Sequence, residues 1–355
     1  MGYFENMRCA VVDGMGSVKR QRRSRHTMSA LICGLDVHKD STYATILNSE
    51  GKIVDQTRME NEKVASYLSQ HKVGRVAMES STAVTPLYRQ LKKEGFDAVV
   101  SHPKKTKLIA EAKIKSDRVD SKAIAQLLRM DWLPLSYVPD EDIGALREKV
   151  RRRAFLVRER VKLRVKIKSY LTSQGLKWPT DYGLWTKAGL VWLHDLNLTP
   201  VESYLRLIDV LSGEIRMLSK ELKREAKADE DVGLLMTVPG IGYYSALLVK
   251  SEIGDIGRFP FAEKLCSYAG LVPSTYQSGG MVRHGNITKG SRWLRWIMIE
   301  CASTHVSKYD TWISRSYRCL AGRKGKNTAR VAAARKLLVV CYSVLKHKKP
   351  FYDQP

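Results

Sequence analysis

The stretch LICGLDVHKDSTYATILNSEGKIVDQTR, residues 31–58, decides the class of fold. It contains three short β-rich runs, and a turn at Ser49-Glu50-Gly51 separates the last two. The runs cover residues 31–37, 42–48 and 52–58. This spacing predicts three β-strands connected as a meander.

Helical and strand-like patterns alternate after the meander. A helix, a strand, a helix, a strand and a final helix are expected over residues 61–71, 73–80, 84–94, 96–102 and 114–128. Meandering strands followed by alternating helices and strands predict an α/β domain in which helices pack on a layered sheet. We place this domain at residues 28–140.

Four acids fall where such a sheet could bring them together. Asp36 and Glu79 each lie near the end of a predicted strand, and Asp117 and Asp120 share one face of the final helix. The ordinary explanations are a turn position, a helix cap and surface salt pairing. However, strand ends and a helix face can converge at a sheet edge, and oxygen-only clusters bind Mg²⁺ or Mn²⁺. The arrangement favours a metal site suited to phosphodiester displacement.

The overall charge indicates a polyanionic partner. The 355 residues include 61 Lys and Arg against 36 Asp and Glu, a net charge of +25. Nucleic acid is the usual partner of such an excess, and an anionic membrane surface is the competing interpretation. No apolar run approaches the length of a membrane-spanning helix, and no secretory signal pattern is present. We therefore expect DNA as a partner and no membrane.

The cysteines indicate the cellular compartment, and the N-terminal residues indicate where the folded part of the chain begins. Six cysteines show neither CxxC nor Cys/His pairing, which argues against a zinc site and a disulfide framework and suits a reducing, cytoplasmic setting. Residues 1–27 look unlike folded sequence. Their KRQRRSR run is either a basic, disordered nucleic-acid arm or lies upstream of a true start at Met28. We favour the second explanation, because the first predicted strand begins soon after Met28.

Two long helices are expected over residues 141–228. The first has apolar residues three or four positions apart and a dense series of arginines and lysines on its other faces, including Arg151, Arg152 and Arg158. Such density suits a phosphate backbone better than a solvated face. The second keeps a heptad pattern from Val201 to Leu222, which predicts a coiled coil. Its partner is either the first helix or a second subunit, in a homodimer or homotetramer.

The third region, residues 229–348, is expected to be mostly helical and is followed by a tail over 349–355. The VPGIG segment predicts a helix-hairpin-helix, in which Gly240 and Gly242 free backbone N–H groups for a DNA phosphate. A plain tight turn is the alternative. Further along, a Gly- and Ser-rich stretch carries the candidate DNA contacts Arg283, Lys289, Arg292 and Arg295. A serine beside such cations could attack phosphorus.

Together these residues resemble the DEDD transposases of the insertion sequence 110 family. The motifs GLDVHKD, AMESS, KSDRVDSKAIA, VPGIG, YAGLVPS, and SGG followed by GNITKGSRWLR occur in the family's order from Met28 onward. The resemblance implies a RuvC-like, ribonuclease-H-type domain whose four acids are Asp36, Glu79, Asp117 and Asp120. It also implies a serine nucleophile in an SG element, which matches Ser278-Gly279 here, with Ser274 and Ser291 as lesser candidates.

The same resemblance implies an activity and partners. Family members recombine DNA through a transient phosphoserine link, and they assemble as oligomers in which acids of one subunit approach the serine of another. They use a structured guide RNA to select target and donor DNA, and they work in prokaryotic cells at the nucleoid. The alternatives are a Mg²⁺-dependent junction-resolving nuclease, in which Ser278 is only structural, and a catalytically silent nucleic-acid-binding protein.

Overall fold

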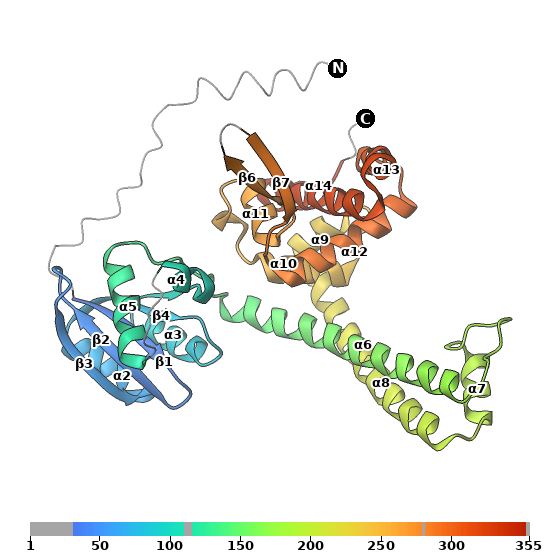
Figure 1. Cartoon of the computed structure of the whole chain (residues 1–355), viewed down its shortest axis with the longest axis horizontal. Coiled ribbons are helices and arrows are strands. Elements are labelled where there is room, and N and C mark those ends of the chain that lie inside the picture. Colours follow the sequence, from blue (N-terminus) through green and yellow to red (C-terminus); the bar gives the residue numbers. More distant parts are fainter. Residues whose placement is uncertain (1–30, 110–115, 279–280, 353–355) are drawn as a thin grey trace, which may run out of the picture. The chain divides into compact units, whose positions relative to one another are not determined.

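The computed structural model describes residues 31–109, 116–278 and 281–352 (Figure 1). The chain divides into two compact units, Met1–Val138 and Pro139–Pro355. The expected tail over residues 1–27 and the start at Met28 lie outside the described residues. The first unit ends close to the domain boundary predicted at residue 140, and the second contains both regions predicted beyond it. The boundary between those two regions, near residue 228, stays a prediction.

A five-stranded mixed sheet forms the centre of the first unit, with the strand order β3-β2-β1-β4-β5. The strands are β1 (Leu31–Val37), β2 (Ser41–Leu47), β3 (Ile53–Glu60), β4 (Val73–Glu79) and β5 (Asp97–Ser101). The first three are antiparallel neighbours, whereas β1, β4 and β5 run parallel to one another. The predicted α/β sheet is therefore confirmed, including the meander that opens it.

Helices cover both faces of this sheet. They are η1 (Asn61–Lys63), α2 (Val64–Gln70), α3 (Val84–Lys93), α4 (Pro103–Ile109) and α5 (Asp117–Arg129). Side chains of α2 and α3 share a core with Cys33 and Leu35, which point to one face of β1. On the opposite face, α5 packs its apolar residues against Ala77 of β4. The sheet thus lies between two helical layers.

Contact between α5 and β1 is close because Gly34 has no side chain. A Cβ atom at Gly34 would lie 2.1 Å from the carbonyl oxygen of Ser121 and 2.5 Å from the backbone nitrogen of Ala125. Both distances are far shorter than van der Waals contact, and both atoms belong to the backbone of α5. Glycine at this position therefore fixes how deeply α5 sits on the sheet.

In the second unit, two long helices form an antiparallel pair. They are α6 (Glu141–Ser173) and α8 (Thr199–Ala228), and α7 (Lys187–Asp195) lies in the connection between them. Lys149 pairs with Glu225, Arg153 with Ser219 and Arg160 with Ser212, so residue numbers rise along α6 as they fall along α8. The heptad residues Val201, Ile208, Ile215 and Leu222 are all buried. Within this chain, α6 is the partner of the heptad helix.

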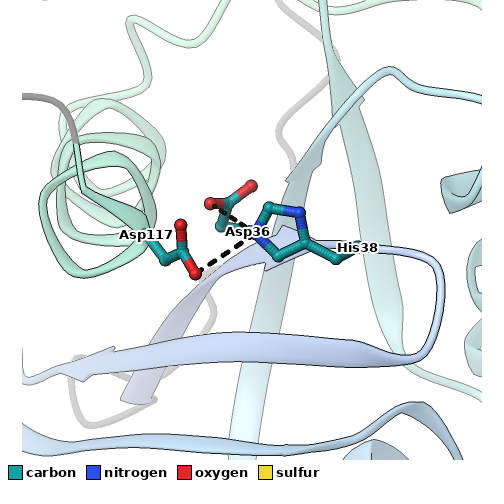
Figure 2. Close-up of side chains that lie close together, drawn as sticks. All are labelled: Asp36, His38 and Asp117. Atoms are coloured by element: carbon teal, nitrogen blue, oxygen red, sulfur yellow. Dashed lines mark ion pairs between the residues drawn. The ribbon is translucent and has the colours of Figure 1, made fainter.

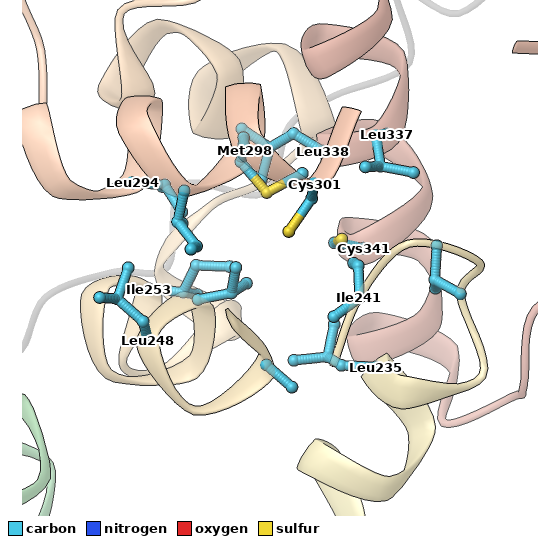
Figure 3. Packing of buried hydrophobic residues seen from close by; sticks show 14 of the residues in the cluster. Leu235, Ile241, Leu248, Ile253, Leu294, Met298, Cys301, Leu337, Leu338 and Cys341 are labelled. Carbon is cyan, nitrogen blue, oxygen red and sulfur yellow. The ribbon is translucent and has the colours of Figure 1, made fainter. Parts of the chain in front are cut away.

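The rest of the second unit is mostly helical, with one β-hairpin. Its elements are α9 (Glu230–Met236), α10 (Tyr243–Ile253), η2 (Ile256–Arg258), α11 (Ala262–Ala269), β6 (Pro273–Ser278), β7 (Met281–Ile287), α12 (Arg292–Lys308), α13 (Trp312–Lys324) and α14 (Lys326–His347). Figure 3 shows its core, in which Leu235, Leu248, Met298 and Leu338 come from α9, α10, α12 and α14. Within the Gly- and Ser-rich stretch, β6 and β7 pair as antiparallel strands.

None of the helices in the described residues combines the length and the apolar composition that crossing a membrane requires.

Candidate active site

Two of the predicted acids lie side by side at the ends of parallel strands. Leu35 of β1 is the register partner of Met78 of β4, and Asp36 and Glu79 are the next residues along each strand. Because side chains alternate along a strand, Asp36 shares the face of Gly34, and Glu79 shares the face of Ala77. This is the face that α5 covers. The strands therefore present both acids to the α5 side of the sheet.

The first turn of α5 supplies the other two acids. Ser116 caps the helix, since its hydroxyl accepts a hydrogen bond from the N–H of Val119. Asp117 and Asp120 follow in the first turn, where the positive end of the helix dipole stabilises negative charge. The sequence thus starts the helix at the point where its acids face the strand ends.

A histidine that the sequence analysis did not select completes the cluster. The Nε2 atom of His38 lies 3.4 Å from an Asp36 oxygen and 3.3 Å from an Asp117 oxygen (Figure 2). One potential ligand atom from each of these three residues lies within 4.8 Å of the others. Of the four predicted acids, Asp36 and Asp117 belong to this cluster of described residues, whereas Glu79 and Asp120 do not. The sequence signal that could have identified His38 was its position two residues after Asp36, at the end of a predicted strand.

The electrostatics of the cluster fit a cation. Burial raises the pKa of Asp36; the nearby His38 lowers it, and the charges of Asp117 and Asp120 raise it further, with a net increase. Asp120 itself lies outside the closest group. Carboxylates that repel one another beside an imidazole form a donor set that suits Mg²⁺ or Mn²⁺. The residues present therefore fit the divalent ion expected from the sequence.

Buried hydrogen bonds hold α5 in its position beside the strands. The hydroxyls of Ser121 on α5 and Thr45 on β2 are 2.7 Å apart, and both residues are fully buried. Gln56 of β3 donates to the Thr45 hydroxyl at 2.9 Å and accepts a hydrogen bond from Arg118 at 2.8 Å. This network links the acid-bearing turn of α5 to two strands, so it limits movement of Asp117 and Asp120.

The VPGIG segment joins α9 to α10 through a tight turn that packs against α12. Gly240 has a φ of +88°, and a Cβ atom there would lie 2.9 Å from the carbonyl oxygen of Cys301. The buried imidazole of His305 contacts the carbonyl of Pro239 at 2.6 Å. The N–H of Gly242 donates to Ser245 at 2.9 Å, so this group already has a partner within the protein. Binding of DNA by this turn stays a prediction.

The predicted basic contacts of the second unit differ in how far they are engaged. Arg151 pairs with the buried Glu252 at 2.7 Å, and Arg152 lies 3.9 Å from Glu148. Arg295 donates to the carbonyls of Ala269 and Thr288. Arg158 is exposed, although its guanidinium lies over the ring of Trp293 at 4.9 Å from the centroid. The remaining described candidates, Lys289 and Arg292, are exposed. The side chain of Arg283 lies outside the described residues. Arg151 and Arg295 therefore have structural roles that the charge pattern did not reveal.

The three candidate serines lie in different settings. Ser278 is the last residue of β6 and the register partner of Met281; its side chain and Gly279 lie outside the described residues. The hydroxyl of Ser274 donates to the carbonyl of Asn286 at 2.9 Å. Ser291 caps α12 and lies 3.2 Å from the Glu252 carboxylate. The two lesser candidates thus already make internal hydrogen bonds.

An α/β sheet that gathers acids at its edge, joined to a strongly basic helical unit, defines an enzyme that acts on DNA. Comparison with known protein families agrees. One model, described as a transposase, matches residues 33–174, and the model of the transposase IS116/IS110/IS902 family matches residues 232–318. The chain belongs to this family and is a DNA transposase.

Several known proteins are similar over most or part of the chain. The transposase for insertion sequence element IS1111A of Coxiella burnetii is 29% identical, covering 94% of each chain. The transposase for insertion sequence element IS1328 of Yersinia enterocolitica is 25% identical, covering 88% of this chain and 96% of its own. A pilin gene-inverting protein of Moraxella bovis is 31% identical over 33% of this chain and 38% of its own.

Among solved structures, RuvC of T. thermophilus in complex with a Holliday junction substrate is a weak match. It is 12% identical with a TM-score of 0.25, covering 30% of this chain and 99% of that chain. Because this similarity is so low, it does not indicate the type of sheet domain. The strand order and the positions of the acids do.

Proposed function

We propose that this transposase is a site-specific recombinase that cuts and rejoins DNA through a covalent phosphoserine intermediate. The acids of a ribonuclease-H-type domain would hold Mg²⁺ or Mn²⁺, and Ser278 would be the nucleophile. The observation that carries the proposal is the convergence of Asp36 and Asp117, from a strand end and a helix start, beside one imidazole. The mixed sheet order, with β1 flanked by an antiparallel and a parallel neighbour, supports the type of domain.

The proposed chemistry consists of two transesterifications. The Ser278 oxygen attacks a DNA phosphorus, the bond from phosphorus to the 3′ oxygen breaks, and a 5′-phosphoserine link and a free 3′-hydroxyl result. The serine proton is released and the leaving oxygen takes up a proton. A 3′-hydroxyl of the exchanged strand then attacks the phosphoserine, which regenerates Ser278. One phosphodiester is exchanged for another, so no nucleotide cofactor is consumed.

The acids have a defined task in this scheme. Asp36, Glu79, Asp117 and Asp120 would hold the divalent ion, which stabilises negative charge on the attacking and leaving oxygens. The hydrogen bond between the hydroxyls of Ser121 and Thr45 would help to keep the helix acids aligned with the strand acids. Burial raises the pKa of Asp36, so its surroundings disfavour a bare carboxylate, and a bound cation would compensate for the lost solvation.

The partners of this reaction follow from the charge and the relatives. The net charge of +25 supports binding of DNA at the element ends and the target. The name of the pilin gene-inverting relative supports site-specific recombination. A structured guide RNA, oligomer formation through a coiled coil of α6 and α8, and work at the nucleoid in the cytoplasm of a prokaryotic cell belong to the proposal, on the family resemblance.

A metal-dependent junction-resolving nuclease is the second candidate. The same acids would then activate water, and Ser278 would have only a structural role. The acid cluster supports both candidates equally, because neither the position of the acids nor their charge identifies the nucleophile. A covalent protein–DNA species separates them. A silent DNA-binding protein is the third candidate, and loss of cleavage with intact DNA binding in Asp36→Ala would argue against it.

The test incubates the full chain with Mg²⁺, a junction DNA spanning the element ends and RNA transcribed from the flank of the element. Products are separated on a denaturing gel before and after protease treatment. The variants are Ser278→Ala, Asp36→Ala and two matched controls, Ser274→Ala in the same strand and Asp40→Asn, an exposed acid near the cluster. We expect a slow-migrating, protease-sensitive DNA species in the wild type and both controls.

The two catalytic variants distinguish the candidates. Loss of this species in both Ser278→Ala and Asp36→Ala supports the recombinase. Free nicked DNA that persists in Ser278→Ala but disappears in Asp36→Ala establishes the nuclease instead. Omission of the RNA tests the guide: an unchanged yield and target choice without RNA would remove it from the proposal.

A further inference from the structure

His38 occupies an ordered position at the centre of the acid cluster. Its backbone N–H donates to the carbonyl of Ser41 at 2.9 Å, which closes the turn between β1 and β2. The side-chain amide of Asn61 donates to the carbonyls of His38 and Lys39 at 3.1 and 3.0 Å. The Thr42 hydroxyl donates a hydrogen bond to the side-chain oxygen of the same Asn61 amide. The turn is thus tied to the end of β3, and the imidazole is directed between Asp36 and Asp117 (Figure 2).

The arrangement differs from an ordinary ion pair. Both short distances of His38 involve one atom, Nε2, and they end on carboxylates from a strand and from a helix. One hydrogen on Nε2 cannot point at two separate oxygens with good geometry. A cation, in contrast, can be shared by all three atoms. Ligand atoms around an octahedral ion with bonds of about 2.1 Å lie about 3 Å apart, which is close to the observed distances.

A second histidine in the same unit provides the contrast. The Nε2 of His71 lies 3.5 Å from a single carboxylate, that of Asp55. The Nδ1 atom of His71 lies 3.0 Å from the backbone carbonyl oxygen of Tyr67. The ring centroids of His71 and Tyr67 are 4.5 Å apart. The same Asp55 accepts a hydrogen bond from the Tyr67 hydroxyl. His71 therefore has the contacts of a structural histidine, whereas the contacts of His38 go to two proposed metal ligands.

We propose that His38 is a ligand of the divalent ion through Nε2, together with Asp36 and Asp117, and that it shifts the metal preference of the site from Mg²⁺ toward Mn²⁺. This inference rests on the proposed function, since it deepens the description of the same metal site. Mg²⁺ takes oxygen ligands and keeps bound water, whereas imidazole nitrogen suits transition metals. An imidazole among the carboxylates therefore stabilises bound Mn²⁺ more than bound Mg²⁺. His38 is 47% exposed, so an ion can reach it from solvent.

The test measures metal binding by the full chain without DNA. Mn²⁺ and Mg²⁺ are titrated separately by calorimetry, and pulsed electron paramagnetic resonance of the Mn²⁺ complex detects a coordinated nitrogen. The variants are His38→Ala, His71→Ala as the matched control, His38→Asp and Asp36→Ala. We expect nitrogen coupling in the wild type and His71→Ala, and its loss in His38→Ala. The Mn²⁺ affinity of His38→Ala should fall at least about tenfold, the loss that even outer partners of metal ligands cause.

The Mg²⁺ titrations address selectivity. In His38→Ala the Mg²⁺ affinity should change by less than the Mn²⁺ affinity, because water replaces the imidazole. In His38→Asp the ratio of Mg²⁺ to Mn²⁺ affinity should rise above that of the wild type, because all protein ligands are then oxygens. Since His38 is 47% exposed, His38→Ala should keep the wild-type circular dichroism spectrum and unfolding temperature. His38→Asp should keep the spectrum, although the added carboxylate repels Asp36 and Asp117 while no ion is bound.

Two outcomes overturn the inference without affecting the proposed function. These are the absence of nitrogen coupling in the wild-type Mn²⁺ complex, and metal affinities in His38→Ala that equal those of the wild type. Asp36→Ala reports on the proposed function itself. If that variant binds both ions as the wild type does, the acid cluster is not the metal site, and the proposed function fails together with the inference.

Discussion

The acid cluster and the hairpin that carries Ser278 are built in different ways. The clustered acids Asp36 and Asp117 come from β1 and α5 of a layered domain, and Gly34 and Ser121 fix the contact between those elements. Ser278 ends a strand of a two-stranded ribbon, and its described backbone partner is the neighbouring strand. The relative positions of the acids therefore depend on packing between elements distant in sequence. The backbone position of Ser278 depends mainly on the local pairing register of β6 and β7.

The largest expected effect comes from disrupting that packing without changing an acid. Gly34→Val places a side chain where even a Cβ atom would lie 2.1 Å from the Ser121 carbonyl oxygen. Overpacking typically costs about 1–3 kcal/mol, and more where backbone must move. We expect loss of at least about 3 kcal/mol of unfolding free energy of the first unit, with loss of metal binding, measured by urea unfolding and Mn²⁺ titration.

A glycine in open space is the control for this substitution. A Cβ atom at Gly213, within α8, has nothing within 4 Å. Gly213→Ala should therefore leave metal binding unchanged and raise the stability of the second unit by about 0.5–1 kcal/mol. Wild-type stability in Gly34→Val would contradict the close packing of α5 on β1.

The second effect separates chemistry from folding at the acid cluster. Asp120 lies in the first turn of α5, and its charge acts on Asp36. Asp120→Asn keeps the shape of the side chain and removes its charge. We expect a loss of about 10²–10³ in the rate of DNA cleavage, the size typical of one electrostatic group in an active site. DNA affinity, measured by fluorescence anisotropy, should stay within about twofold. A parallel loss of DNA affinity would instead assign Asp120 to DNA binding.

A third, smaller effect probes the hydrogen bonds that position the helix acids. Ser121→Ala leaves the buried Thr45 hydroxyl without its partner on α5. The Thr45 hydroxyl still accepts a hydrogen bond from Gln56, so the loss should stay at the lower end of the about 1–3 kcal/mol that an unsatisfied buried group costs. Removal of both hydroxyls is less costly than the sum of the single losses. The double variant Thr45→Val with Ser121→Ala should therefore show a negative interaction energy in a double-mutant cycle, measured by urea unfolding. Strict additivity would show that the two hydroxyls do not interact.

The smallest expected effect concerns two arginines of the second unit, one exposed and one paired with a buried acid. Arg292 is exposed, and Arg292→Ala should lower the slope of log affinity for DNA against log salt by about 1 while leaving stability unchanged. Arg151 pairs with the buried Glu252. Arg151→Ala should instead destabilise the second unit, because it removes a partner from a buried charge. Equal salt slopes in the wild type and Arg292→Ala would remove Arg292 from the DNA surface.

The amino-acid pattern was sufficient to predict the strands, the positions of the four acids at element ends and the family. Short β-rich runs bounded by turn residues are sufficient to predict strands such as 31–37, because both signals lie within a few residues of one another. The heptad from Val201 to Leu222 predicted the buried face of α8. The four residues that share one heptad position are all buried, namely Val201, Ile208, Ile215 and Leu222. These features depend on residues close together in the chain, which is why the sequence reveals them.

Three-dimensional packing, in contrast, sets which residues distant in the sequence contact one another. It placed His38 between Asp36 and Asp117, engaged Arg151 with Glu252, and made α6 the partner of α8 within the chain. A charged side chain looks the same in the sequence whether it faces solvent, DNA or a buried partner. Its role is set by long-range packing, in which a contact such as Gly34 on α5 fixes the register between elements and therefore the neighbours of each charge.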